Sequence, residues 1–102
     1  MDTALAAIAE PRRRQILGLI AATELSAGEI AGHFDVTRPA ISQHLAVLRS
    51  AGLVTERRAG TRRFYRARPE GLAGLREWLD AFWRGGLAQL RIEAEREAKR
   101  AR

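Results

Sequence analysis

The chain has 102 residues, the size of one domain, and we expect a single domain spanning residues 1–102. Hydrophobic residues make up 46% of the sequence and charged residues 29%, a balance that excludes an intrinsically disordered chain. Cysteine is absent, which excludes disulfides, thiolate metal sites and a cysteine nucleophile.

The net charge is +6, and every cationic side chain except Lys99 is an arginine. Arginine binds phosphate and guanine through two parallel hydrogen bonds, so a basic domain of this size indicates a polyanionic partner, most often nucleic acid. Charge alone fits equally well a protein from a genome that favours arginine codons. The case for nucleic acid therefore depends on the pattern of the elements.

We expect neither a membrane partner nor an enzyme. No run approaches 18 apolar residues, and the first residues lack the basic-then-apolar pattern of a signal peptide, so a cytoplasmic protein is expected. Two histidines, no cysteine and no glycine-rich phosphate loop leave no nucleophile–base pair and no expected cofactor.

Four helices are predicted in the first half of the chain. The first covers residues 2–10, and Pro11 opens the second, because proline suits the first helical position. The third follows a capping box that runs from Ser26 to Glu29, and includes Ile30 and Phe34 on one face. The fourth begins after Thr37 as N-cap and ends before Gly52.

A β-hairpin is predicted next. Strands are expected over residues 53–58 and 61–67, with Ala59-Gly60 as the turn between them. Its tip and flanks carry Arg57, Arg58, Arg62, Arg63, Arg66 and Arg68. A hairpin so rich in like charges repels itself, which is easier to explain if it meets an anion in use.

Pro69 and Glu70 begin a long last helix. Its apolar stripe comprises Leu72, Leu75, Leu79, Phe82, Trp83, Leu87 and Leu90. The sequence leaves open where this helix ends and whether Gly85-Gly86 bends or breaks it. A small monomer would expose this stripe, so pairing with a second copy across a two-fold axis is expected.

Residues 26–52 therefore form two capped helices joined by a tight turn, the pattern of a helix-turn-helix. At about 100° per residue, Ile41, Leu45 and Leu48 point inward, and the outward face carries no acid from residue 38 to 51. Gln43 suits adenine and Arg38 suits guanine or phosphate. The fold class is mainly α with a small β-hairpin wing, a winged helix-turn-helix ordered as four helices, two strands and one helix. The candidate DNA-binding residues are Thr37, Arg38, Pro39, Ser42, Gln43, His44 and Arg49 on the fourth helix and Arg57, Arg58, Arg62 and Arg63 in the wing.

Several side chains admit two interpretations. His44 is either a packed, hydrogen-bonded histidine or a reader of DNA, and His33 is expected on the surface of a helix. Arg12-Arg13-Arg14 either pairs with acids of the last helix or touches DNA. Trp78, Phe82 and Trp83 fit a core or an interface better than a ligand pocket.

The sequence resembles the ArsR/SmtB family of winged helix-turn-helix transcriptional regulators. The similarity is centred on residues 35–54, where Thr37-Arg38-Pro39 leads to His44-Leu45 and then to Ala51-Gly52-Leu53-Val54. It extends to Pro11 and the second helix, to Gly60 and Phe64-Tyr65 in the wing, and to about Trp83.

The resemblance implies a bacterial repressor that binds a pseudo-palindromic operator as a homodimer and controls its own or a neighbouring operon. It implies that the first and last helices join the subunits. The expected interface residues are Leu5, Ile8, Leu75, Leu79, Phe82, Trp83, Leu87 and Leu90.

Many members of that family release DNA on binding a metal ion, but residues 29–33 hold no thiol, and Glu77 and Asp80 have no histidine beside them. The sequence therefore resembles the metal-independent members, with no metal site and an unknown small-molecule inducer, if any. Open alternatives are a divalent-metal-responsive repressor with non-cysteine ligands, a partner-binding winged helix without DNA affinity, and an RNA-binding winged helix.

Overall fold

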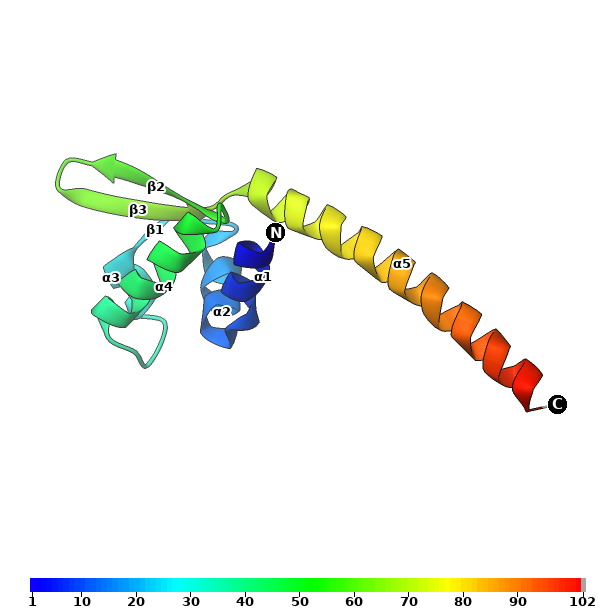
Figure 1. Cartoon of the computed structure of the whole chain (residues 1–102). Helices are drawn as coiled ribbons and strands as arrows, with labels where there is room; N and C mark the ends of the chain where they lie inside the picture. The colour runs from blue at the N-terminus through cyan, green and yellow to red at the C-terminus, as the bar shows by residue number, and fades with distance from the viewer. Residues whose placement is uncertain (102) are drawn as a thin grey trace.

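The computed structural model of the chain describes residues 1–101. Its elements follow in the order α1 (Asp2–Ala9), α2 (Pro11–Ile20), β1 (Leu25–Ser26), α3 (Ala27–Ala31), α4 (Arg38–Ser50), β2 (Val54–Ala59), β3 (Arg62–Ala67) and α5 (Pro69–Arg100). Helices α1 to α4 and the base of the sheet form one body, from which the turn end of the β2–β3 hairpin and α5 project (Figure 1). This is a winged helix-turn-helix, as the sequence predicts.

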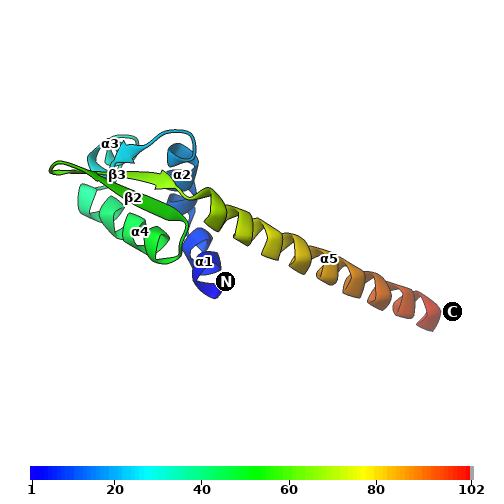
Figure 2. The same ribbon diagram turned by 90° about the horizontal axis from the view of Figure 1, so that it is seen from above.

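The molecule is long and thin because α5 leaves the body, as both views show (Figures 1 and 2). Its extents are 70 × 27 × 21 Å and its radius of gyration is 18.9 Å. A compact chain of this length has a radius of gyration of about 13 Å. Most of α5 therefore makes no contribution to the core of its own chain.

The core lies where the inner faces of the helices meet the base of the sheet. The largest fully buried side chains are Ile16, Ile20, Ile30, Ile41, Leu45, Leu48 and Leu53. The predicted inward face of α4 is confirmed, because Ile41, Leu45 and Leu48 are at most 1% exposed. Burial of each such side chain stabilises the fold by about 1.5–3 kcal/mol, so this face fixes the orientation of α4.

Local hydrogen bonds begin and end the helices at the predicted places. Ser26 and Glu29 form both hydrogen bonds of the capping box, and the Thr37 hydroxyl accepts from the amide of Ala40 at 3.3 Å. Gly52 ends α4 with φ of 76°, which suits glycine. The amide of Gly52 donates to the Arg49 carbonyl and that of Leu53 to the Leu48 carbonyl, the two bonds of a Schellman motif.

The sheet differs from the predicted two-stranded hairpin. It has three strands in the order β1-β3-β2, because Leu25 and Ser26 pair antiparallel with Tyr65 and Phe64. A two-residue strand has no alternation that a sequence can display. The turn also lies one residue later than expected, at Gly60-Thr61, because Ala59 pairs with Arg62. Gly60 has φ of 63°, the sign that a type II′ turn requires at its first central position.

Two helix boundaries differ from expectation, and the question left open for the last helix is answered. α1 ends at Ala9 because Glu10 is extended and caps α2, and α3 ends at Ala31, before the predicted Phe34. α5 is continuous from Pro69 to Arg100, so Gly85-Gly86 neither breaks nor ends it. Each of these two glycines lowers the stability of the helix by about 1 kcal/mol relative to alanine, a small cost for a helix of many turns.

α5 joins the body through a contact between two glycines. A Cβ added to Gly71 would lie 2.0 Å from the carbonyl oxygen of Gly52, so only glycine fits there. The amide of Arg68 donates to the Leu53 carbonyl at 2.8 Å, and its guanidinium donates to the Gly52 carbonyl at 3.3 Å. The start of α5 therefore lies directly against the end of α4.

Candidate nucleic-acid interface

One face of α4 is free for a ligand. Ser42, Gln43, Ala46, Val47 and Ser50 are exposed, opposite the buried face. Thr37, Arg38, Pro39 and Arg49 are also exposed at the two ends of the helix. This surface is small, polar or cationic along its whole length, as a helix in the major groove requires.

His44 lies at the edge of the buried face and is half-buried. Arg13 of α2 lies 3.4 Å from its Nδ1, and because arginine has no acceptor, Nδ1 is the acceptor in this contact. Of the two interpretations of His44, the structure favours the packed, hydrogen-bonded one. His33 is exposed, but it lies in the turn after α3 and not on a helix.

A hollow separates the first turn of α4 from the wing. Its lining includes Arg38 and Ser42 from α4 and Thr61, Arg62, Arg63 and Tyr65 from the wing. Gly28 also lines the hollow beside Arg38, and a Cβ added there would make an ordinary van der Waals contact, 3.8 Å from the guanidinium carbon. Three arginines and a hydroxyl around one concave surface form a setting that suits a phosphate group.

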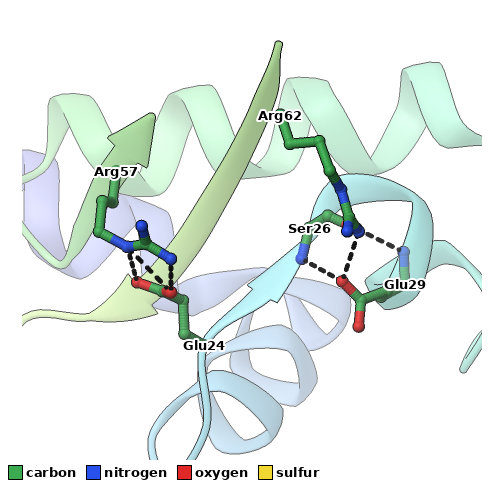
Figure 3. Close-up of polar contacts among 5 residues, drawn as sticks. All are labelled: Glu24, Ser26, Glu29, Arg57 and Arg62. Atoms are coloured by element: carbon green, nitrogen blue, oxygen red, sulfur yellow. Dashed lines mark hydrogen bonds and ion pairs between the residues drawn. The ribbon is translucent and has the colours of Figure 1, made fainter. Parts of the chain in front are cut away.

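Two wing arginines are held by carboxylates of the body (Figure 3). Arg57 of β2 is 2.5 Å from Glu24, with its Nε 3.0 Å from both carboxylate oxygens. Arg62 of β3 is 3.3 Å from Glu29. Both guanidinium groups also lie over the ring of Phe64, at 5.0 and 4.8 Å from its centroid.

These contacts change the acidity of both carboxyl groups. The hydrogen bond from Arg57 lowers the pKa of Glu24, and the same pair raises the pKa of Arg57. Hydrogen bonds from Ser26 lower the pKa of Glu29, and the charge of Arg62 lowers it further. Both acids are therefore ionised at neutral pH and available to compete for the wing's cations.

A third acid ties the wing to α4. Glu56 of β2 pairs with Arg49 of α4 and with Arg63 of β3, the latter at 3.3 Å. Arg49 thus fixes the angle of the wing as well as lying at the exposed surface. Among the ion pairs within residues 1–101, Arg58 and Arg66 do not appear, which leaves these two wing arginines uncommitted.

The run Arg12-Arg13-Arg14 contacts its own N-terminal helices rather than acids of the last helix, and its expected contact with DNA stays a prediction. Arg13 donates to the carbonyls of Ala7 and Ala6, and Arg14 donates to that of Ile8 at 2.7 Å. These carbonyls are at the C-terminal end of α1, where the helix dipole favours cations. Arg12 lies 4.8 Å from the centroid of the Phe34 ring. No ion pair joins these arginines to α5 in the described part of the chain.

The apolar stripe of α5 is exposed. Leu79 is 39% exposed, Phe82 60%, Trp83 64%, Leu87 47% and Leu90 61%. Trp78 and Phe82 stack on each other with their centroids 5.3 Å apart. Leu75 differs from expectation, since it is 5% exposed and belongs to the chain's own core; Leu5 and Ile8 are half-buried against that core.

The described residues 1–101 contain no group of three or more histidine, aspartate or glutamate side chains placed to hold a metal ion. Asp80, considered as a ligand from the sequence, lies 4.0 Å from Arg76. Within the same residues no helix is long and apolar enough to span a membrane.

Sequence reasoning did not find the acids that organise the wing. Glu24 and Glu29 are each 33 residues from their arginine partners, whereas Glu56 is seven residues from Arg49. The available signal was the strand alternation that places Arg57, Arg62 and Phe64 on one face. Thr61 and Tyr65, which line the hollow, were also missed.

A helix-turn-helix with an exposed second helix and a cationic hairpin beside it defines a class, the winged-helix nucleic-acid-binding proteins. Residues 10–56 match the sequence profile described as "Bacterial regulatory protein, arsR family". The HTH-type transcriptional regulator Rv2034 of Mycobacterium tuberculosis is 50% identical over 97 residues, which cover 92% of this chain and 90% of that protein. The chain belongs to the arsR family of bacterial regulatory proteins.

Two further similarities bear on repression and assembly. The transcriptional repressor SdpR of Bacillus subtilis is 38% identical over 65 residues, 64% of this chain and 72% of SdpR. The solution structure of the homodimeric winged helix-turn-helix DNA-binding domain Mb0332 of Mycobacterium bovis, described as a possible ArsR-family regulator, has a TM-score of 0.67 and 36% identity. It covers 79% of this chain, which in turn covers 75% of that domain. The family consists of regulators rather than enzymes.

Proposed function

We propose that this chain is a single-domain DNA-binding repressor that binds a pseudo-palindromic operator as a homodimer and controls its own or a neighbouring operon. One observation carries the proposal: the exposed, acid-free face of α4 adjoins a hollow lined by Arg38, Ser42, Arg62 and Arg63. A duplex against this surface would place base edges on the helix and a phosphate group in the hollow.

Within this complex, α4 enters the major groove. Gln43 is exposed at its centre and reads adenine through two hydrogen bonds. Thr37, Arg38, Pro39 and Ser42 lie at the phosphate backbone and fix the register. Arg49 contacts the backbone at the other end of the helix while it remains paired with Glu56.

The wing extends the contact along the duplex. Arg58 is uncommitted, whereas Arg57, Arg62 and Arg63 are paired with acids of the same chain. Arginine is attracted to the negative potential of narrow minor grooves, so the hairpin tip supplies affinity next to the site that α4 reads.

The exposed stripe of α5 is the proposed subunit interface. Phe82, Trp83 and Leu90 are each about three-fifths exposed, on a helix that leaves the body. Burying apolar surface contributes about 25 cal/mol per Å², which favours pairing of this stripe with its copy. The homodimeric Mb0332 domain supports the same assembly here. A two-fold dimer would present two copies of α4 to adjacent turns of one duplex face.

Repression follows if the operator overlaps a promoter, because a bound dimer excludes polymerase from the same DNA. The similarity to SdpR supports this direction of control.

Fluorescence anisotropy titration tests the proposal with a labelled duplex from the region upstream of the chain's own gene. We expect tighter binding to this duplex than to a shuffled duplex or to double-stranded RNA of the same sequence. Specific affinity typically exceeds non-specific affinity by about 10³-fold or more. Equal affinity for all three, or preference for RNA, would refute operator recognition.

A further inference from the structure

Wing arginines are already paired with anions before any DNA arrives. We propose that Glu24 and Glu29 are positioning residues that occupy Arg57 and Arg62 in the free protein, compete with DNA phosphates for them, and so limit affinity for DNA. The inference rests on the proposed function, because it concerns how the wing engages a duplex.

The geometry places both acids against one face of the hairpin. Arg57 pairs with Phe64 across the strands, and Arg62 lies two residues before Phe64, so the three side chains share a face. Glu24 lies just before β1 and points toward Arg57, and Glu29 lies in α3 and points toward Arg62 (Figure 3). The ring of Phe64 supports both guanidinium groups while the carboxylates hold their edges.

Carboxylate and phosphate oxygens are alternative acceptors for the same guanidinium edge. The side chains of Arg57 and Arg62 are 57% and 62% exposed, so a phosphate can reach them. Exposed ion pairs contribute little to stability, so exchange of one partner for another is energetically accessible.

Glu29 can release Arg62 without loss of local structure. Its carboxylate also accepts from the amide of Ser26 at 3.2 Å, and the Ser26 hydroxyl accepts from the amide of Glu29 at the same distance. This capping box remains when the arginine leaves, so α3 keeps its N-terminal cap. The exchange therefore moves a side chain and leaves the helix-turn-helix intact.

Glu29→Gln tests the competition, because glutamine can also complete a capping box. We expect tighter binding to both operator and shuffled duplexes, by about two- to five-fold per wing, the value of one exposed ion pair. We also expect the logarithm of the affinity to fall more steeply with the logarithm of the salt concentration, by up to about 0.9 per freed arginine. In the unmodified protein, a carboxylate that loses its arginine to DNA binds a cation from solution, and the glutamine variant has no such carboxylate.

A matched variant controls for net charge. Glu97→Gln removes the same charge from the far end of α5, where Glu97 pairs only with Arg100 in the described residues, and should bind as the unmodified protein does. Arg62→Gln with and without Glu29→Gln should bind alike, because the acid acts through that arginine. Glu24→Gln provides an independent test at Arg57, and thermal melting verifies that each variant folds.

The outcomes separate the two levels of inference. If the unmodified protein binds duplex DNA but Glu29→Gln and Glu24→Gln bind no more tightly than Glu97→Gln, the competition is refuted and the proposed function stands. Weaker binding by both variants would also refute it, because the acids would then orient the arginines toward DNA. If the unmodified protein binds no duplex, the proposed function and this inference both fail.

Discussion

Gln43 is the side chain on which base recognition is expected to depend. It is exposed at the middle of α4, between the buried ridge and the small residues Ala46 and Val47. Its amide offers one donor and one acceptor, the pair that adenine displays in the major groove. In the proposed complex the neighbouring side chains reach the phosphate backbone, so Gln43 is expected to contribute to discrimination between sequences more than to total affinity.

Gln43→Ala should therefore cost about 1–3 kcal/mol of binding free energy on the operator and almost nothing on a shuffled duplex. Anisotropy titrations on both duplexes measure the difference. Gln89→Ala, the same substitution on the exposed surface of α5, should affect neither. An equal loss on both duplexes would exclude Gln43 from base recognition.

Arg58 is expected to contribute more to the salt dependence than the paired arginines do. It lies near the wing tip without an ion pair in the described residues, so its full charge is available to a phosphate. Arg58→Ala should reduce the slope of log affinity against log salt by about one. Arg96→Ala, an equal charge change on distal α5, should leave the slope unchanged. A slope unaltered by Arg58→Ala would show that Arg58 meets no phosphate.

At the scale of elements, the junction between α4 and α5 is the least tolerant part of the chain. Gly71→Ala would bring a methyl group within 2.0 Å of the Gly52 carbonyl oxygen, and backbone on both sides has to move. Overpacking of this kind typically costs about 1–3 kcal/mol. The expected result is a lower free energy of unfolding in urea.

Gly74→Ala is the matched control, one turn further along the same helix. Nothing lies within 4 Å of a Cβ added there, and alanine has the higher helix propensity. This variant should be as stable as the parent or more stable by up to about 1 kcal/mol. Equal stability of the two variants would show that the glycine contact relaxes without cost.

Low pH should weaken the caps and ion pairs together. The pKa of Glu10 is lowered mainly because its carboxylate accepts a hydrogen bond from the amide of Arg13 at 2.9 Å. The pKa values of Glu24 and Glu29 are lowered by Arg57 and by Ser26, respectively. A carboxyl group whose pKa is lower in the folded state than in the unfolded state stabilises the fold at pH values above its unfolded-state pKa. That contribution disappears as the pH falls through its folded-state pKa.

Stability should thus be level near neutrality and decline from about pH 5 downward. Urea unfolding at about pH 7 and about pH 3 measures the decline. Glu10→Gln keeps an acceptor at the N-cap but cannot titrate, so it should lose less stability over this interval. A decline of the same size in that variant would remove Glu10 from the explanation.

Features encoded by neighbouring residues were predictable from the sequence, and those encoded by distant residues were not. Ser26, Thr37 and Gly52 act on amides or carbonyls within a few positions, so their caps are confirmed. Strand β1 depends on a partner about forty residues away in sequence, and its two residues carry no pattern. The Glu24–Arg57 and Glu29–Arg62 pairs, each 33 residues apart, arise only when α3 and the wing meet.

The candidate surface on α4 was predictable because period-3.6 burial determines which side chains remain outside. Sequence reasoning could not show that Arg49, Arg57, Arg62 and Arg63 are shared between possible DNA contacts and intramolecular acids. The net charge calculated from the sequence is the same whether an arginine is free or paired with an acid.

At the scale of the whole molecule, α5 is the element on which assembly is expected to depend. Its 32 residues span about 48 Å, and its stripe from Leu79 to Leu90 contacts nothing in the body that would cover it. Trp83 is the most exposed large side chain of the stripe. The expected interface is therefore concentrated on aromatic residues, as binding hot spots usually are.

Trp83→Ala should shift the monomer–dimer equilibrium toward monomer, with a loss of about 2 kcal/mol or more for an aromatic anchor. Analytical ultracentrifugation over a concentration series measures it. Arg84→Ala changes the next residue, which lies about 100° further round the helix and outside the apolar stripe, and should leave the equilibrium unchanged. If Trp83→Ala leaves the monomer–dimer dissociation constant unchanged, this tryptophan stays exposed to solvent in the dimer and is not part of the interface.

The contact between Gly52 and Gly71, at the corner where α4 meets α5, affects how these two helices can move. Where side chains separate two helices, rotamer changes can absorb a small rotation; between Gly52 and Gly71 there is only backbone. We therefore expect α5 (the long arm) and α4 (the helix proposed to read DNA) to rotate together as one rigid unit. A rotation of about 5° at the corner displaces the far tip by roughly 4 Å over an arm of this length. Anything that alters how two arms cross would change the spacing between the two reading helices without touching either of them.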